Sequence, residues 1–117
     1  MASSKPIFCD SYVTAADLST KQFYAVKLDA TGKLALAGAG DTCIGILQNN
    51  PGLGQVATVA VLGSSKAKAG AAVTAGLPVG ADANGKLANA GNGIGIAVTG
   101  AVLDDIFEVM LVHIGVP

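Results

Sequence analysis

Apolar and polar residues alternate along several short stretches of this chain, which is the pattern of strands that bury one face. Within residues 25–36 the apolar side chains stand at alternate positions on both sides of a polar centre. That centre reads Asp29-Ala30-Thr31-Gly32. Asp at the first position and Gly at the last are typical of a type I turn closed by a residue with positive φ. The pattern therefore predicts a β-hairpin.

Most of the remaining chain also predicts short strands. Residues 40–47 are predicted to form a strand that is entered through a Gly-Asp turn. Residues 55–62 and 106–112 are apolar on both faces, as in strands that are covered on both sides or that face another subunit. The helical candidates are short, at residues 17–22 and 101–105. We therefore predict an all-β fold, a small β-barrel or sandwich of the β-tulip kind with at most short helices.

An internal repeat is the most informative feature of the chain. The stretch DATGKLALAG at residues 29–38 returns as DANGKLANAG at residues 82–91, at an offset of 53 (82 minus 29). An IGI triplet then returns at an offset of 50 (94 minus 44). The two hairpins would share the same turn chemistry, with these structural turn residues: Asp29, Gly32, Asp82 and Gly85.

The repeat also sets the expected organisation of the chain. Two copies of one hairpin-containing unit are predicted over residues 26–62 and 79–112, inside a single β-rich domain of residues 21–117. Residues 1–20 lack glycine and lie outside both copies, so they are predicted to form an N-terminal arm.

The arm is the candidate for attachment to a partner. It carries large side chains with high β-propensity, which suit a segment that adds a strand to the edge of another protein. The candidate contact residues are Ile7, Phe8, Tyr12 and Val13. The alternative, that this segment is the first strand of the domain itself, is equally compatible with the sequence.

Composition narrows the classes of partner. Apolar residues make up 51% of the chain and charged residues 13%, so polar surface is scarce and a subunit interface is expected. The net charge of −1 does not favour nucleic acid, and no apolar run is long enough for a membrane helix. The N-terminus lacks the apolar run of a signal peptide, so we expect synthesis in a cytoplasm.

Candidate catalytic and metal-binding residues are few. His113 is the sole histidine, and Cys9 and Cys43 form no CxxC motif. We expect reduced thiols, although the spacing is also compatible with a disulfide. We therefore predict no enzymatic activity, no cofactor and no metal site. Lys33 and Lys86 at the hairpin tips resemble in position the modified lysine of lipoyl or biotinyl carrier domains, but their Gly and Leu neighbours are not those of carrier families.

The order of the motifs resembles a known family. The chain shows a V-x-L-D-x-x-G turn, an I-G-I-L strand leading to N-N-P-x-x-G, a V-A-V-L-G strand and an A-G-x-x-V-x-x-G-x-P-V connector. A second D-x-x-G-K hairpin and an I-G-I-A strand complete the series. From Ala25 onward this order resembles the capsid cement, or head decoration, proteins of tailed bacteriophages.

That resemblance implies a structural virion protein. Such a protein would sit on the outer surface of the expanded head after assembly in the host cytoplasm. It would form a homotrimer, bind the major capsid protein and bridge neighbouring capsomers against the pressure of packaged DNA. Two alternatives stay open, namely a carrier-like or other small β binding module, and a structural module of a phage tail or fibre.

Overall fold

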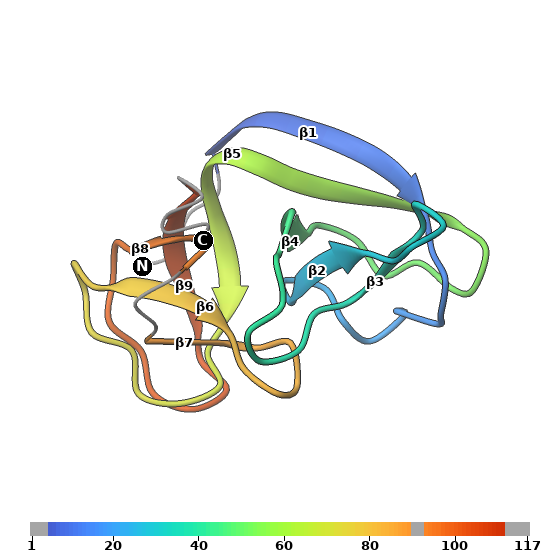
Figure 1. Cartoon of the computed structure of the whole chain (residues 1–117). Coiled ribbons are helices and arrows are strands. Elements are labelled where there is room, and N and C mark those ends of the chain that lie inside the picture. Colours follow the sequence, from blue (N-terminus) through green and yellow to red (C-terminus); the bar gives the residue numbers. More distant parts are fainter. Residues whose placement is uncertain (1–4, 90–92, 112–117) are drawn as a thin grey trace.

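The computed structural model describes residues 5–89 and 93–111, with the backbone alone for residues 5–8. Every regular element in these ranges is a β-strand, which confirms the all-β prediction (Figure 1). The helical candidates at residues 17–22 and 101–105 lie in connections between strands. The strands are β1 (Lys5–Val13), β2 (Ala25–Leu28), β3 (Leu34–Leu36), β4 (Gly45–Leu47), β5 (Val56–Lys68), β6 (Pro78–Ala81), β7 (Leu87–Asn89), β8 (Gly95–Ala97) and β9 (Ile106–Leu111).

The strand order shows the duplication directly. The strands form one antiparallel sheet in the order β3-β2-β4-β5-β9-β8-β6-β7, and β1 pairs with β5 off this path. Read from the β5–β9 pair outward, the two halves carry the same connections. We call residues 5–62 unit 1 and residues 63–111 unit 2. Figure 1 shows β2, β3 and β4 of unit 1 on the right and β6 to β9 of unit 2 on the left.

Strand registers follow the offsets of the sequence repeat. Val26 pairs with Leu36 in unit 1, and Val79 pairs with Asn89 in unit 2, both at the offset of 53 read from the sequence. The IGI strands follow at the offset of 50. Ile46 faces Ala60 in β5, and Ile96 faces Met110 in β9.

The repeat extends further than the sequence predicts, because it includes β1. Val13 pairs with Val56, and the equivalent pair in unit 2 is Lys68 with Ile106. The strand equivalent to β1 is therefore the second half of β5, at an offset of 55 (68 minus 13). Residues 5–13 of the predicted arm are a strand of the first unit and lie inside the repeat.

A single strand therefore serves both units. The first half of β5 closes unit 1, and its second half opens unit 2. Gly63 lies at the junction with a φ of 92°, a value that favours glycine. Figure 1 shows β5 running beneath β1 and then bending sharply into unit 2. The bend lets one continuous strand contribute to two cores.

The duplicated turns are built as the sequence predicts. Gly32 and Gly85 both have a φ of 80°. The Asp29 carboxylate accepts hydrogen bonds from the amides of Thr31 and Lys33 at 2.9 and 3.0 Å. Asp82 does the same for Asn84 and Lys86 at 2.8 and 3.0 Å. The carboxylate thus satisfies the backbone donors that each turn leaves without a strand partner.

Two other positive-φ positions match across the units although one residue of each pair is not glycine. Phe23 has a φ of 71° where unit 2 has Gly76 at 86°, and Asp104 has 67° where unit 1 has Gly54 at 74°. The amides of Phe23 and Gly76 also donate equivalent hydrogen bonds, each 2.7 Å long, to the carbonyls of Leu47 and Ala97. At these positions the two units therefore share a backbone conformation although their residue types differ.

The two turn glycines differ in their surroundings, which leads to a first expected outcome. A Cβ at Gly32 would meet no atom within 4 Å, whereas a Cβ at Gly85 would lie 2.6 Å from Leu36 Cδ1 and 3.2 Å from the Ala37 carbonyl oxygen. Gly32→Ala is expected to cost about 1 kcal/mol of folding free energy from positive φ alone. Gly85→Ala adds overpacking and is expected to cost about 2–3 kcal/mol. Equal denaturant midpoints for the two variants would contradict this difference.

The sheet encloses two hydrophobic cores. The unit 1 core contains Leu18, Val26, Leu34, Leu47, Ala57 and Val59. The larger core contains the equivalent residues of unit 2, among them Val73, Val79, Leu87, Ala97, Phe107 and Val109. It also takes in Ala25, Ile46 and Ala60 from unit 1. Unit 2 therefore packs its interior against the outer face of unit 1.

Candidate attachment surface

All four attachment candidates of the N-terminal segment lie in β1, and the side chains of two of them are described. Ile7 and Phe8 lie in β1, where Phe8 pairs with Leu62, but their side chains fall outside the described part. Tyr12 and Val13 point to opposite faces of the strand. The Tyr12 ring packs against the unit 1 core, whereas the Val13 side chain is 45% exposed. Tyr12 and Val13 therefore do not share one surface.

Tyr12 is held in place by two contacts. Its ring covers the side of the unit 1 core, and its hydroxyl donates a hydrogen bond of 3.2 Å to the Asp10 carboxylate. Burial and this hydrogen bond to the neighbouring carboxylate raise the pKa of Tyr12 above its usual value. The equivalent residue in unit 2 is Ala67, which is fully buried. Tyr12 thus closes the side of unit 1 with a large side chain where unit 2 needs only a methyl group.

Val13 belongs to an exposed apolar cluster that the sequence pattern missed. It lies opposite Val56 in the β1–β5 pair, and the turn that leads into β5 carries Leu53. The Gln55 carbonyl of that turn accepts a hydrogen bond of 3.0 Å from the Thr14 amide, next to Val13. Leu53 is 68% exposed and Val56 59% exposed. We call Val13, Leu53 and Val56 the unit 1 patch.

Unit 2 carries the same feature at the equivalent place. Leu103 and Ile106 correspond to Leu53 and Val56, and Val102 stands beside them. Their side chains are all exposed. We call these three residues the unit 2 patch. An apolar leucine inside a loop otherwise made of Asn, Pro, Gly and Gln was the signal available in the sequence for the first of the two patches.

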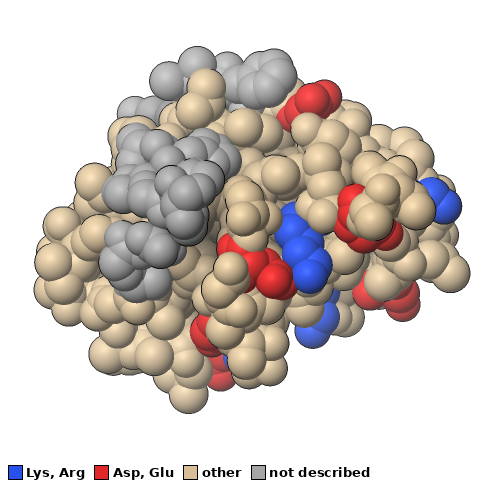
Figure 2. Space-filling model, viewed as in Figure 1, with Lys and Arg blue, Asp and Glu red and all other residues tan. Residues whose placement is uncertain are grey.

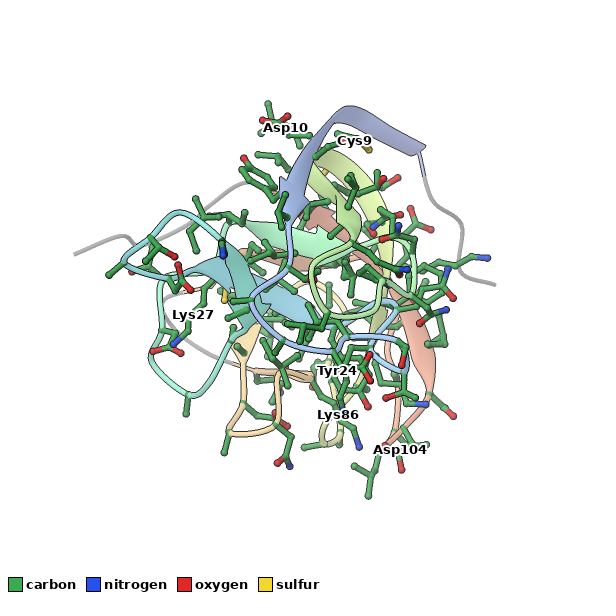
Figure 3. The ribbon with its side chains drawn as sticks, turned by 90° about the vertical axis from the view of Figure 1, so that its right-hand side faces the viewer. Cys9, Asp10, Tyr24, Lys27, Lys86 and Asp104 are labelled. Carbon is green, nitrogen blue, oxygen red and sulfur yellow. The ribbon has the colours of Figure 1, made fainter. Side chains whose placement is uncertain are left out.

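Charged groups are sparse on the surface. Figure 2 shows a mostly uncharged face on which the charged side chains lie from the middle to the right of the view. Two ion pairs account for four of the charges. Lys27 lies 2.8 Å from Asp41, and Lys86 lies 2.6 Å from Asp104. Figure 3 shows the Lys86–Asp104 pair at the end of the molecule opposite Cys9 and Asp10. Most of the rest of the face in Figure 2 carries no charged side chain.

The two tip lysines differ in their partners. Lys33 is exposed at the first hairpin, whereas Lys86 donates a hydrogen bond to Asp104, which raises the pKa of its ammonium group. The duplicated turn therefore presents lysine in two different environments.

The thiols and acidic groups show no built chemical site in the described residues. Cys9 and Cys43 are both free, and burial raises the pKa of the Cys43 thiol, which disfavours the reactive thiolate. Within residues 5–89 and 93–111, no three His, Cys, Asp or Glu side chains gather as metal ligands would. His113 lies outside that part of the chain. The same ranges contain no helix long and apolar enough to cross a membrane.

These features define a class of protein, an antiparallel all-β domain made of two equivalent units with exposed apolar patches. Its fold is similar to that in the crystal structure of the N base of the head fibre protein gp8.5 of bacteriophage phi29. The TM-score is 0.70 at 11% sequence identity, and the match covers 94% of this chain and 98% of that chain. At this identity the similarity shows a shared fold. No family model and no curated protein matches the sequence.

Proposed function

We propose that this chain is a structural protein of a phage virion that binds the outer surface of the expanded head and bridges neighbouring capsomers. The observation that carries the proposal is the fold shared with the base of a phage head fibre over nearly the whole chain. The order of sequence motifs supports it independently, because that order resembles the head decoration proteins. The partners would be the major capsid protein and further copies of this chain, in a homotrimer.

The two patches are the proposed capsid contacts. Each is an exposed turn that carries a leucine next to a β-branched residue on a strand, and each subunit presents both. A trimer would therefore offer six such contacts to the head. Several weak contacts of this kind give high avidity, since each one formed raises the effective concentration of the next. The stabilisation of the head would be mechanical, by apolar area buried across seams between capsomers.

Head binding by patch variants tests this proposal. Expanded heads that lack the protein are incubated with purified chain, pelleted, and assayed for bound protein. Leu53→Lys is expected to weaken binding at least tenfold, or about 1.4 kcal/mol, with an unchanged melting temperature. Ala30→Lys adds the same charge at the exposed tip of the first hairpin and is the matched control. If the parent chain stays in the supernatant, it does not bind heads and the proposed function is wrong. If Leu53→Lys binds like the parent, the patch assignment is wrong.

A second candidate function is the base of a head fibre. The fold match favours it, because the similar structure is described as the N base of a head fibre. Both functions place the chain on the head, and they differ in what projects from it. Images of decorated heads separate them, since a decoration protein gives a compact knob and a fibre base carries an extended projection.

A further inference from the structure

Within the chain, one face of unit 1 is buried against unit 2. The equivalent face of unit 2 is more exposed. Along β2, β4 and β5 neighbouring residues alternate between the two cores. Val26, Leu47 and Val59 face the unit 1 core, while Ala25, Ile46 and Ala60 face unit 2. The latter three are fully buried. The outer face of unit 1 is thus covered by the interior of unit 2.

The equivalent face of unit 2 is partly exposed to solvent. Pro78, Ile96 and Met110 occupy the positions of Ala25, Ile46 and Ala60. Pro78 and Ile96 are half-buried, and Met110 is 41% exposed. We call these three residues, together with Leu77 and Val98, the unit 2 face.

Leu77 and Val98 stand where unit 1 has Tyr24 and Gln48. The Gln48 amide reaches unit 2 by donating a hydrogen bond of 2.9 Å to the Ser65 hydroxyl. At the same place on unit 2, both residues are apolar and 46% exposed. The unit 2 face is therefore apolar at all five positions, whereas unit 1 carries Tyr24 and Gln48 at two of them.

At the opposite end of the molecule, unit 1 exposes the residues that are equivalent to those by which unit 2 contacts unit 1. In unit 2, Ala67, Ile94 and Leu111 are buried at 0%, 3% and 2% exposure, in the core that unit 1 covers. Ala81 packs against the same core. Their equivalents in unit 1 are more exposed, with Leu28 at 38% and the others half-buried. We call these equivalents the unit 1 mouth: Tyr12, Leu28, Ile44 and Val61.

We propose that copies of this chain associate head to tail, with the unit 2 face of one copy seated on the unit 1 mouth of the next. The contact between copies repeats the contact between the units within one copy. At that internal contact the Lys68 amide donates a hydrogen bond of 3.0 Å to the Phe23 carbonyl. The equivalent bond between copies joins the Val13 amide to the Gly76 carbonyl. The two surfaces differ, so the contact is heterologous and either closes into a ring or extends.

This inference concerns self-association and does not rest on head binding. It predicts weaker self-association for two variants, one on each surface. Met110→Lys places a charge on the unit 2 face, and Leu28→Lys places one at the unit 1 mouth. Each is expected to weaken self-association about a hundredfold, because a lysine would be desolvated at an apolar contact. Leu62→Lys, which changes a leucine that is 44% exposed and lies outside both surfaces and both patches, is the matched control and is expected to associate like the parent.

Mixing the two variants distinguishes a head-to-tail contact from a symmetric one. Each variant keeps one intact surface, so an equimolar mixture is expected to form a dimer that grows no further, measured by sedimentation equilibrium or light scattering. Two copies joined face to face through the same surface would not be rescued by mixing. Circular dichroism melting of each variant first verifies that it is folded.

The outcomes decide the proposal either way. It is wrong if the folded parent chain is monomeric at its highest soluble concentration, if Met110→Lys associates like the parent, or if the mixture stays monomeric. If Met110→Lys keeps the parent's oligomeric state but no longer binds heads, the capsid protein occupies the unit 2 face and the proposal is also wrong. Failure of the parent chain to bind heads would overturn the proposed function and leave this inference standing.

Discussion

Replacing Gly95 by alanine is expected to lower the melting temperature by about 15 °C. A Cβ at this position would overlap the carbonyl oxygen of Met110 and would lie 2.9 Å from a methyl group of Val109. The neighbouring atoms are backbone and buried side chain, so they cannot rotate away. We expect a cost of about 3 kcal/mol, at the upper end of the usual range for overpacking. In a domain of this size each kcal/mol corresponds to about 5 °C.

Gly45 provides an independent check of the same explanation. It is the equivalent residue of unit 1, where a Cβ would overlap the Ala60 carbonyl oxygen and lie 2.7 Å from Val59 Cγ1. Gly45→Ala is therefore expected to destabilise the fold about as much as Gly95→Ala. Gly32→Ala, at a turn with open space, is the matched control and is expected to shift melting by only about 5 °C. Melting curves in which either strand variant behaves like Gly32→Ala would contradict the close approach of β4 to β5 and of β8 to β9.

Deletion of residues 2–20 is expected to unfold the protein at room temperature. The deleted segment contains β1 and two residues of the connection that follows it, Thr14 and Leu18, each 2% exposed. Its loss would uncover the unit 1 core and leave the carbonyls of Leu34 and Pro51 without the amides of Ala15 and Leu18. The lost apolar burial and hydrogen bonds together exceed the stability of a typical small domain.

Circular dichroism and the dispersion of amide NMR signals measure this directly. The truncated chain is expected to lack a cooperative melting transition, and addition of a peptide of residues 2–20 is expected to restore one. A truncated chain that melts like the full chain would show that the segment is the separate arm inferred from sequence. Because truncation is expected to unfold the chain, attachment to heads is better tested by point variants.

The sequence predicted the features that depend on local chemistry. The D-x-x-G turn needs a carboxylate and a residue with positive φ, so its recurrence at Asp29 and Asp82 identified two hairpins and their offset. The all-β class followed from alternation and glycine turns. The IGI match identified the second part of the repeat, whereas the close approach of a neighbouring strand at its central glycine is seen only in the structure.

The sequence left open whether residues 1–20 form an arm or the first strand of the domain, because the pairing of β1 depends on contacts between residues distant in sequence. The equivalents of Tyr12 and Val13 in unit 2 are Ala67 and Lys68, so no sequence match joins the two strands. The backbone of β1 is fixed by its pairing with β5, which tolerates almost any side chain. Of the residues expected to attach the arm, Tyr12 packs against the unit 1 core and Val13 is exposed.

The exposed patches were missed for a related reason. Leu53 and Leu103 lie in turns, where apolar residues carry no strand or helix periodicity, and their shared position becomes visible only through the duplicated backbone. The same duplication explains why many apolar side chains remain exposed. The unit 2 face is equivalent to the face of unit 1 that is buried at the internal contact. The unit 1 mouth is equivalent to the side of unit 2 that is buried at the same contact.

The most direct test of the account is a cryo-EM reconstruction of expanded heads to which the purified chain has been added. We expect extra density on the outer surface, present at seams between capsomers, into which this two-unit fold fits with its apolar patches toward the shell. Heads that remain bare after incubation, or density confined to the tail or the interior of the head, would contradict the proposed function.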